Sequence, residues 1–345
     1  MLKTKYLLLL LLLFGCSKND SEEITTIINN TKLKNINIRL IDSLIIPIDT
    51  IAINDAKLIL NINDTIYWYD DHSPELFIFD RKLNLIKHID YSGRGPGEFN
   101  SSYKISFSNN NALIYDPLTK RITRFKGLTK YEGSFNYSKY NINRLVAVND
   151  LKLFLQLRDA KISRKPAFVL IDTSGIELMQ GGVKPANAII QDVISGGSVV
   201  VDKNENVYFS YISDYRIWKV NTKTKKISII NNKPSYFKES NPDEVKKLPQ
   251  HDFAKYYFTH SRTWNIFFVE PNFIIQQIFP EKPTIRPEEL YSYLEIFNTE
   301  GTKIGTKILF KKEIINVQGE KIYCKSFVSD DLNKTKKIEI YEITL

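Results

Sequence analysis

The chain has 345 residues, of which 43% are hydrophobic, 12% aromatic and 25% charged. These fractions are typical of a globular protein with a large core, and together with 14 glycines and 13 prolines they exclude disordered, collagen-like and low-complexity chains. The formal net charge is +9, but the lysines are scattered, which does not favour a nucleic-acid-binding patch. The densest clusters, both in expected hairpin turns, are Lys223, Lys225, Lys226 and Lys334, Lys336, Lys337.

Residues 1–15 have the pattern of a lipoprotein signal peptide. Lys3 and Lys5 precede an apolar run at residues 6–14, which is too short to span a bilayer. The run leads into Leu-Phe-Gly-Cys, a segment that resembles a bacterial lipobox, although Phe14 stands where a small residue is usual. The resemblance implies cleavage before Cys16 and acylation of its sulfur and amine, and several acyl chains hold a protein on a membrane more firmly than one.

The second cysteine, Cys324, lies in an apolar stretch, and we expect it to be a buried small side chain rather than a nucleophile. If Cys16 is lipidated, no intramolecular disulfide can form. Residues 16–35 are expected to be the lipidated cysteine and a polar tether, and their early acids resemble surface-export signals of some Gram-negative lipoproteins. The expected location is the cell envelope, at the outer membrane, on its periplasmic or its surface face.

A β pattern starts at residue 36 and continues to the C-terminus, with short apolar runs between turn residues and without long helical periods. After an orphan run at residues 36–48, two strand types alternate. Copies of the first lie at residues 66–69, 112–115, 153–155, 207–209, 273–275 and 322–324. Copies of the second lie at residues 76–80, 121–125, 167–172, 216–221, 293–298 and 337–341.

Six copies of a three- or four-stranded unit predict an all-β fold, a six-bladed β-propeller over residues 36–345. A single unit cannot bury both faces of its sheet, whereas radial packing buries them and leaves short edges. Because the chain ends on a strand of the second type, we expect the orphan N-terminal run to supply the outer strand that closes the last blade. A seven-bladed ring and two β-sandwiches are the alternatives.

A glycine-rich motif, SGRGPGEF, stands at residues 92–99 beside the first blade. It resembles the Gly-x-Gly-Pro-Gly-Glu-Phe/Tyr signature of six-bladed propeller lipoproteins of Gram-negative bacteria, and NHL-repeat and TolB-like propellers are similar more distantly. The resemblance implies the propeller fold and the lipid anchor, with the motif joining the outer strand of one blade to the inner strand of the next. Most of that family has no assigned activity, so it implies little about function.

The motif itself predicts a tight turn between blades. Its three glycines permit positive φ, and Pro96 fixes one turn residue. We expect Glu98 to accept backbone N–H bonds within the loop. A phosphate cradle is the alternative, but the Lys-Ser/Thr pair and the following helix of a P-loop are missing. Arg94 and Glu98 are the candidate binding residues of this loop.

The longest irregular segment, residues 232–263, lies between the fourth and fifth blades. Asn241, Pro242 and the acids after them predict a short helix through Lys247. Aromatic residues with Arg and His follow, which is a composition typical of binding surfaces. The alternative is an insertion that folds its aromatic side chains onto the rim of the propeller. The candidate binding residues are Tyr256, Tyr257, His260, Arg262 and Trp264.

Metal and catalytic motifs are weak, and no catalytic residue is assigned. The histidines are His72, His88, His251 and His260. No pair of them has short metal-ligand spacing, and the acidic loop at residues 202–206 lacks the glycine and glutamate of an EF-hand, which favours a hairpin turn. Some six-bladed propellers are metal-dependent lactonases. The groups that could supply such ligands from separate blades are Asp70, Asp80, Asp116, Asp172 and Asn221.

Together these features predict a lipid-anchored binding or scaffold module whose partner is an outer-membrane protein or a glycan. A lactonase-type, metal-dependent hydrolase with its site at the channel mouth is the alternative, and a structural subunit of an envelope complex is a third interpretation. The sequence favours binding over catalysis, and no cofactor is predicted, with a divalent metal in the channel left open. Nucleic-acid binding is disfavoured because the chain leaves the cytoplasm.

Overall fold

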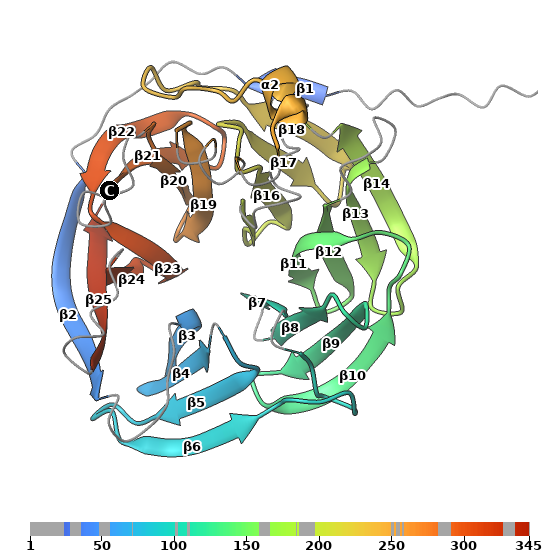
Figure 1. Ribbon diagram of the computed structural model, residues 1–345, viewed down its shortest axis with the longest axis vertical. Helices are drawn as coiled ribbons and strands as arrows, with labels where there is room; N and C mark the ends of the chain where they lie inside the picture. Colours follow the sequence, from blue (N-terminus) through green and yellow to red (C-terminus); the bar gives the residue numbers. More distant parts are fainter. Residues whose placement is uncertain are drawn as a thin grey trace, which may run out of the picture.

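A computed structural model shows six β-sheets arranged in a ring (Figure 1). It describes residues 24–27, 36–47, 56–70, 72–100, 103–108, 111–158, 166–183, 185, 197–249, 252, 256, 259–281, 291–326 and 335–344. In that part of the chain each sheet is a blade of four antiparallel strands, and one blade carries a fifth. The six-bladed propeller predicted by the repeats is confirmed, and the seven-bladed ring and the two sandwiches are wrong.

The first three blades each run from the inner strand to the outer one. Blade 1 contains β3 (Ala56–Ile62), β4 (Thr65–Asp70), β5 (Glu75–Phe79) and β6 (Leu85–Asp90). Blade 2 contains β7 (Lys104–Ser108), β8 (Asn111–Asp116), β9 (Arg121–Lys126) and β10 (Lys130–Asn136). Blade 3 contains β11 (Ile142–Asn149), β12 (Lys152–Leu157), β13 (Pro166–Asp172) and β14 (Glu177–Val183).

The last three blades complete the ring. Blade 4 contains β15 (Val199–Val201), β16 (Asn206–Ser210), β17 (Ile217–Asn221) and β18 (Lys226–Ile230), with β1 (Ile24–Ile27) outside them. Blade 5 contains β19 (Arg262–Val269), β20 (Phe273–Phe279), β21 (Ser292–Asn298) and β22 (Lys303–Phe310). Blade 6 contains β23 (Lys312–Gln318), β24 (Lys321–Ser326), β25 (Thr335–Thr344) and β2 (Asn37–Pro47).

The middle strands carry the core, which explains why they dominate the sequence pattern. The two recurrent strand types are the second and third strands of every blade. The second strand β8 is buried along its whole length, because neighbouring blades cover both of its faces. The outer strand β6 is exposed at almost every position. Middle strands therefore read as continuous apolar runs, whereas outer strands have the composition of a solvated edge.

Two sets of contacts join the ends of the ring. On the outside, β2 pairs antiparallel with β25 from Asn37 opposite Thr344 to Pro47 opposite Thr335, so blade 6 takes its outer strand from the N-terminal run. On the inside, the Asn316 side-chain amide donates to the Ile59 carbonyl oxygen at 2.8 Å. The Gln318 side-chain oxygen accepts the backbone N–H of Asn61 at 2.8 Å. Blades 6 and 1 are thus connected at both radii.

Side-chain hydrogen bonds also cross the other seams between blades. The Tyr69 hydroxyl donates to the Leu128 carbonyl at 2.8 Å, and the Tyr103 hydroxyl donates to the Asp70 carbonyl at 2.6 Å. The Gln156 amide donates to the Ser210 carbonyl at 2.8 Å. Each such bond contributes about 1 kcal/mol when its partners are buried, and their common role is to hold adjacent blades in a fixed register.

The fifth strand of blade 4 comes from the N-terminal segment that the sequence predicts to be a tether. β1 pairs in parallel with β18, with Ile24 opposite Ile227 and Ile27 opposite Ile230. The β-branched sequence Ile-Thr-Thr-Ile favours a strand, and the outer edge of blade 4 offers it unpaired backbone groups. Part of the segment expected as a tether at residues 16–35 is therefore docked on the propeller, and the rest of that segment lies outside the described residues.

Two local predictions are confirmed. The short helix is α2 (Pro242–Lys247), and the side-chain oxygen of Asn241 accepts the Asp243 N–H at 3.0 Å as its N-cap. The acidic loop at residues 202–206 is a turn between β15 and β16, because Asp202 Oδ1 accepts the backbone N–H groups of Asn204 and Asn206 at 2.8 and 2.9 Å.

Candidate functional site

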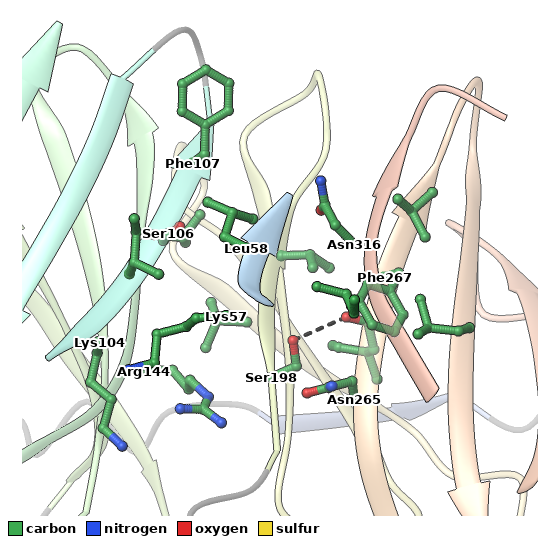
Figure 2. Close-up of a pocket in the computed structure, with 18 of the residues that line it drawn as sticks. Lys57, Leu58, Lys104, Ser106, Phe107, Arg144, Ser198, Asn265, Phe267 and Asn316 are labelled. Atoms are coloured by element: carbon green, nitrogen blue, oxygen red, sulfur yellow. Dashed lines mark hydrogen bonds between the residues drawn. The ribbon is translucent and has the colours of Figure 1, made fainter. Parts of the chain in front are cut away.

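The inner strands of all six blades line a central channel of about 980 Å³ (Figure 2). Since the chain enters every blade at its inner strand, all six inner strands begin at the same end of the channel. We name this end the mouth. A cavity of this size is at the upper end of the range for ligand pockets, which span roughly 300–1,000 Å³.

Among the described residues five cationic side chains line the channel, and the topology places all of them at the mouth. Lys57, Lys104 and Arg144 stand in the first three residues of β3, β7 and β11. Arg158 directly follows β12, and Lys325 lies near the end of β24, and both of these second strands run back toward the mouth. In Figure 2 the head groups of Lys57, Lys104 and Arg144 lie at the same side of the cavity.

The carboxylates among the described lining residues are Glu313 and Glu270. Glu313 lies at the mouth, near the start of β23, and Glu270 follows β19 at the opposite end. The Glu270 carboxylate lies 3.2 Å from the Lys203 ammonium, so it forms an ion pair at the end of the channel opposite the mouth. Among the described lining residues, the mouth therefore carries five cations and one carboxylate, whereas the opposite end carries the carboxylate of Glu270.

Backbone carbonyls hold two of the mouth cations. Lys57 Nζ donates to the Tyr103 carbonyl at 3.2 Å and lies 3.9 Å from the centroid of the Tyr103 ring. Arg144 Nε donates to the Gly197 carbonyl at 3.0 Å. These contacts fix the head groups across the seams between blades 1 and 2 and between blades 3 and 4. A backbone carbonyl carries no net charge, so these two contacts are not ion pairs.

Trp264 forms an aromatic wall beside the mouth carboxylate. Its indole Nε1 donates to Glu313 Oε1 at 3.1 Å, and its ring packs edge-on against Phe279 with centroids 5.6 Å apart. The other oxygen of Glu313 lies 3.8 Å from Lys325 Nζ. Glu313 is thus engaged by an N–H group and an ammonium, which lowers its ability to repel an incoming anion.

Neutral polar groups line the channel at several depths. They are Ser106, Ser198, Asn265, Asn316 and Gln318. Ser198 Oγ donates to the Ile266 carbonyl at 3.0 Å, the bond drawn in Figure 2. Hydroxyl and amide groups both donate and accept, so this wall can bind a ligand rich in hydroxyl groups.

The predicted insertion residues separate into two groups. Trp264 lines the channel, and Tyr257 lies outside the described residues. The Tyr256 and His260 rings stack on each other with centroids 4.0 Å apart, and the Tyr256 hydroxyl accepts the Asn241 N–H at 2.9 Å. Arg262 is buried and its guanidinium lies 4.7 Å from the centroid of the Phe279 ring. Tyr256, His260 and Arg262 are absent from the described channel lining and pack within the rim.

A buried ion pair supports the insertion from blade 5. The Tyr236 hydroxyl donates to Glu295 Oε1 at 2.6 Å, and Lys303 Nζ lies 2.8 Å from Glu295 Oε2. Glu295 has no exposed surface. Burial, and then the nearby Glu295 carboxylate, raise the pKa of Tyr236 far above its usual value, so the phenol stays protonated and donates. The segment that follows β18 is therefore attached to β21 and β22.

The SGRGPGEF loop satisfies its own polar groups. The Glu98 carboxylate accepts the Gly95 N–H at 2.7 Å, and the Arg94 carbonyl accepts from the Arg121 guanidinium at 2.8 Å. The same guanidinium donates to the Glu98 carbonyl, and Phe99 is buried in the core. The predicted backbone contact of Glu98 is confirmed. Neither Arg94 nor Glu98 is among the described channel-lining residues.

The four aspartates and Asn221, the groups that could supply lactonase-type ligands, cap their own turns. Asp70 and Asp116 accept N–H groups just after β4 and β8, on the side of the mouth. Asp80, Asp172 and Asn221 accept N–H groups in the turns after the third strands, at the opposite end. Within the described ranges no three His, Cys, Asp or Glu side chains come together as a metal-binding group.

The two cysteines have different outcomes. Cys16 lies outside the described residues, so its lipidation stays a prediction. Cys324 is fully buried in the core between blades 5 and 6, as expected, and burial raises the pKa of its thiol well above the usual value. A protonated, buried thiol is a poor nucleophile.

Sequence reasoning missed the five cations of the mouth. Each is a single charged residue beside an apolar strand, far in sequence from the others, and resembles a surface lysine or arginine. The available signal was position within the repeat, because three of them stand at the start of an inner strand and two at the end of a second strand. Only an alignment of the six repeats onto blades would have placed them at one end.

Comparisons with known proteins agree with the fold. Residues 17–284 match the DUF5128 family of six-bladed β-propellers, and the chain belongs to that family. A search of curated proteins finds no match to the chain.

Two solved structures are similar over nearly the whole chain. One is a member of the DUF4221 family from Bacteroides vulgatus, with a TM-score of 0.68 and 15% identity over 91% of this chain and 99% of that one. The other is a Bacteroides fragilis protein named as an exported protein, with a TM-score of 0.60 and 12% identity over 94% of this chain and 99% of that one. At these identities the likeness shows the fold alone.

The described residues were also compared with the requirements of a membrane-spanning helix. None of the helices among them combines the length and the apolar composition needed to cross a bilayer.

Proposed function

We propose that this protein is a lipid-anchored binding module of the bacterial envelope whose channel mouth receives an anionic ligand. The observation that carries the proposal is the clustering of five cations from blades 1, 2, 3 and 6 at one end of a 980 Å³ channel. Like charges at one site repel one another, and a bound anion removes that repulsion while it gains attraction from several directions.

The lining favours an acidic oligosaccharide as the ligand. The channel has the volume of a ligand of a few sugar rings and is too small to admit a folded domain. Its hydroxyl and amide groups match sugar hydroxyls, its cations match carboxylate or sulfate groups, and Trp264 offers an aromatic wall against which a sugar face can pack. This ligand is the glycan form of the partner that the sequence predicts.

The envelope location rests on two supports. The lipobox-like segment that ends at Cys16 predicts an acylated N-terminus, and one structural relative is named as exported. The anchor is tested by growing cells with an alkyne-tagged fatty acid and comparing the full-length protein with its Cys16→Ala variant. We expect label on the wild type alone, and label on neither protein would refute the anchor.

Ligand binding is tested by calorimetry with a trimer of galacturonic acid and with the neutral trimer of galactose. We expect the acidic trimer to bind at least about tenfold more tightly, because a charge-assisted hydrogen bond is worth about 1.5–3 kcal/mol. Its affinity should fall as salt is added, since ions screen the attraction. Equal affinity for the two trimers, or affinity that salt leaves unchanged, would contradict an anion site. Tighter binding of an acidic peptide would assign the mouth to a protein segment.

A further inference from the structure

The pairing of β1 shows where the N-terminal segment reaches the propeller. β1 runs parallel to β18, and its first residue, Ile24, lies opposite Ile227 near the start of β18. β18 begins directly after the turn at residues 222–225 that connects it to β17. Ile24 therefore lies beside the tip of the β17–β18 hairpin, and β1 lies on the outer side of blade 4 (Figure 1).

The anchor site lies a short distance away along the chain. Cys16 precedes Ile24 by eight residues. Eight residues span at most about 29 Å even when fully extended, because each residue adds at most about 3.6 Å. Acyl chains on Cys16 would thus hold Ile24, and with it the hairpin tip, within about 29 Å of the bilayer.

The hairpin tip carries a dense group of cations. Lys223, Lys225 and Lys226 are all exposed, and they form one of the two lysine clusters noted in the sequence. Of the groups that face them, Glu205 lies 3.5 Å from Lys223 Nζ and offsets part of the charge. We name Lys223, Lys225 and Lys226 the lysine tip.

We propose that the lysine tip rests on the phosphate headgroups of the leaflet that holds the acyl chains of Cys16. Two independent observations meet here, the register of β1 on β18 and the exposed cations at the same tip. Basic clusters beside a membrane anchor add electrostatic attraction to the hydrophobic anchor, and neither signal alone holds a protein as firmly. The proposal rests on the lipid anchor of the proposed function.

The same geometry orients the channel. The inner strands start at the mouth, and successive strands of a blade alternate in direction, so the turn between a third and a fourth strand lies at the opposite end. The lysine tip is such a turn. A propeller that rests on this tip holds its cationic mouth away from the membrane, where a ligand can enter from the aqueous side.

The test attaches residues 16–345 to vesicles through Cys16, with a maleimide-bearing lipid in place of the natural acyl chains. Buried Cys324 does not compete, because its thiol is fully covered and its pKa is raised. Lysine acetylation followed by mass spectrometry then reports which lysines the membrane covers. On vesicles with anionic phosphatidylglycerol, we expect the lysine tip to be modified about threefold more slowly than in the untethered protein, because contact with the headgroups excludes the reagent.

Exposed Lys247 in α2, on the side of the mouth, should react at an unchanged rate. Acetylation rates of the remaining lysines of blade 4 can be compared on anionic vesicles and on neutral phosphatidylcholine vesicles. Replacing Lys223, Lys225 and Lys226 with Gln should remove the difference between these two rates. A matched variant that replaces Arg81, Lys82 and Lys87 of blade 1 with Gln loses the same charge and should keep that difference.

Two results would overturn the proposal. One is protection spread evenly over the lysines or confined to the mouth. The other is equal protection of the lysine tip in the untethered protein. That result would mean that these lysines are covered by the acidic residues at positions 20, 22 and 23 and not by the membrane. Since the tether is chemical, the orientation can be tested even if the fatty-acid labelling shows that cells do not acylate Cys16, and the two failures stay distinct.

Discussion

The SGRGPGEF loop and the channel mouth lie at the same end of the ring, but they are built in different ways. The loop is held by hydrogen bonds to its own backbone, from the Gly95 N–H to its own Glu98 carboxylate and from Arg121 of β9 to two loop carbonyls. The mouth takes its cations from four blades, at positions from 57 to 325. A conspicuous motif can thus be a structural joint, while the candidate binding site is made of residues that have no motif.

The two regions should also differ in how much they contribute to stability and to ligand binding. Groups that satisfy one another inside a loop stabilise the fold when they are present and destabilise it when one is lost. Cations that line an open cavity can contact a ligand directly, so we expect their removal to lower the affinity for that ligand. Variants in the two regions should therefore separate stability from binding.

The largest expected loss of stability comes from breaking the buried ion pair that supports the insertion. Lys303→Met leaves the buried Glu295 carboxylate without its cation, and we expect a loss of about 3 kcal/mol in the free energy of unfolding. Urea denaturation measures it. Lys238→Met removes the cation of the exposed pair between Lys238 of the insertion and Glu281 after β20, and its effect should stay within about 0.5 kcal/mol. Equal losses would show that the rim does not depend on the buried pair.

The next effect tests the loop. Gly93 has φ +149°, and a Cβ there would lie 2.0 Å from Glu98 Oε2, so Gly93→Ala must displace the carboxylate from Gly95. We expect a loss of about 2–3 kcal/mol in the free energy of unfolding. Gly133 has a similar φ of +159° with open space around its Cβ position, so Gly133→Ala isolates the backbone strain, at about 1 kcal/mol.

A double variant sharpens this measurement. If the clash with Glu98 is the cause, Gly93→Ala in a Glu98→Ala background should lose no more than Gly133→Ala does, because the obstructing carboxylate is gone. The same loss in both backgrounds would mean that the Glu98 contact does not hold the loop.

How far the sequence predicts each region follows from the range of its interactions. The loop, the helix cap at Asn241 and the turn at Asp202 are local, and residue types at fixed spacing predicted all three. The blade count was predictable because the middle strands repeat as buried apolar runs. The mouth was not, because Lys104 and Lys325 meet only through the ring. The docking of β1 was missed as well, since its edge partner lies about 200 residues away.

The mouth should lose binding without losing stability. Lys104→Gln combined with Arg158→Gln removes two of the five cations, and we expect the affinity for the acidic trimer to fall at least about tenfold, from the loss of charge-assisted contacts. The melting temperature should change little. The control replaces Arg81 and Lys82 with Gln on blade 1, at the end opposite the mouth, and should leave affinity intact. An affinity loss in both variants would indicate non-specific attraction by net charge.

The smallest expected effect separates the two roles of Trp264. Trp264→Phe keeps an aromatic wall but removes the N–H donor to Glu313, which keeps its contact with Lys325. Since Glu313 remains partly solvated and keeps its cation, we expect a stability change below about 1 kcal/mol and an affinity change within about threefold. Trp264→Ala removes the wall and should weaken the acidic trimer further, toward the effect of the cation variant, because the sugar face loses its packing partner. If Trp264→Phe already abolishes binding, the indole N–H or the orientation of Glu313 is part of the recognition, and the mouth reads hydrogen-bond geometry as well as charge.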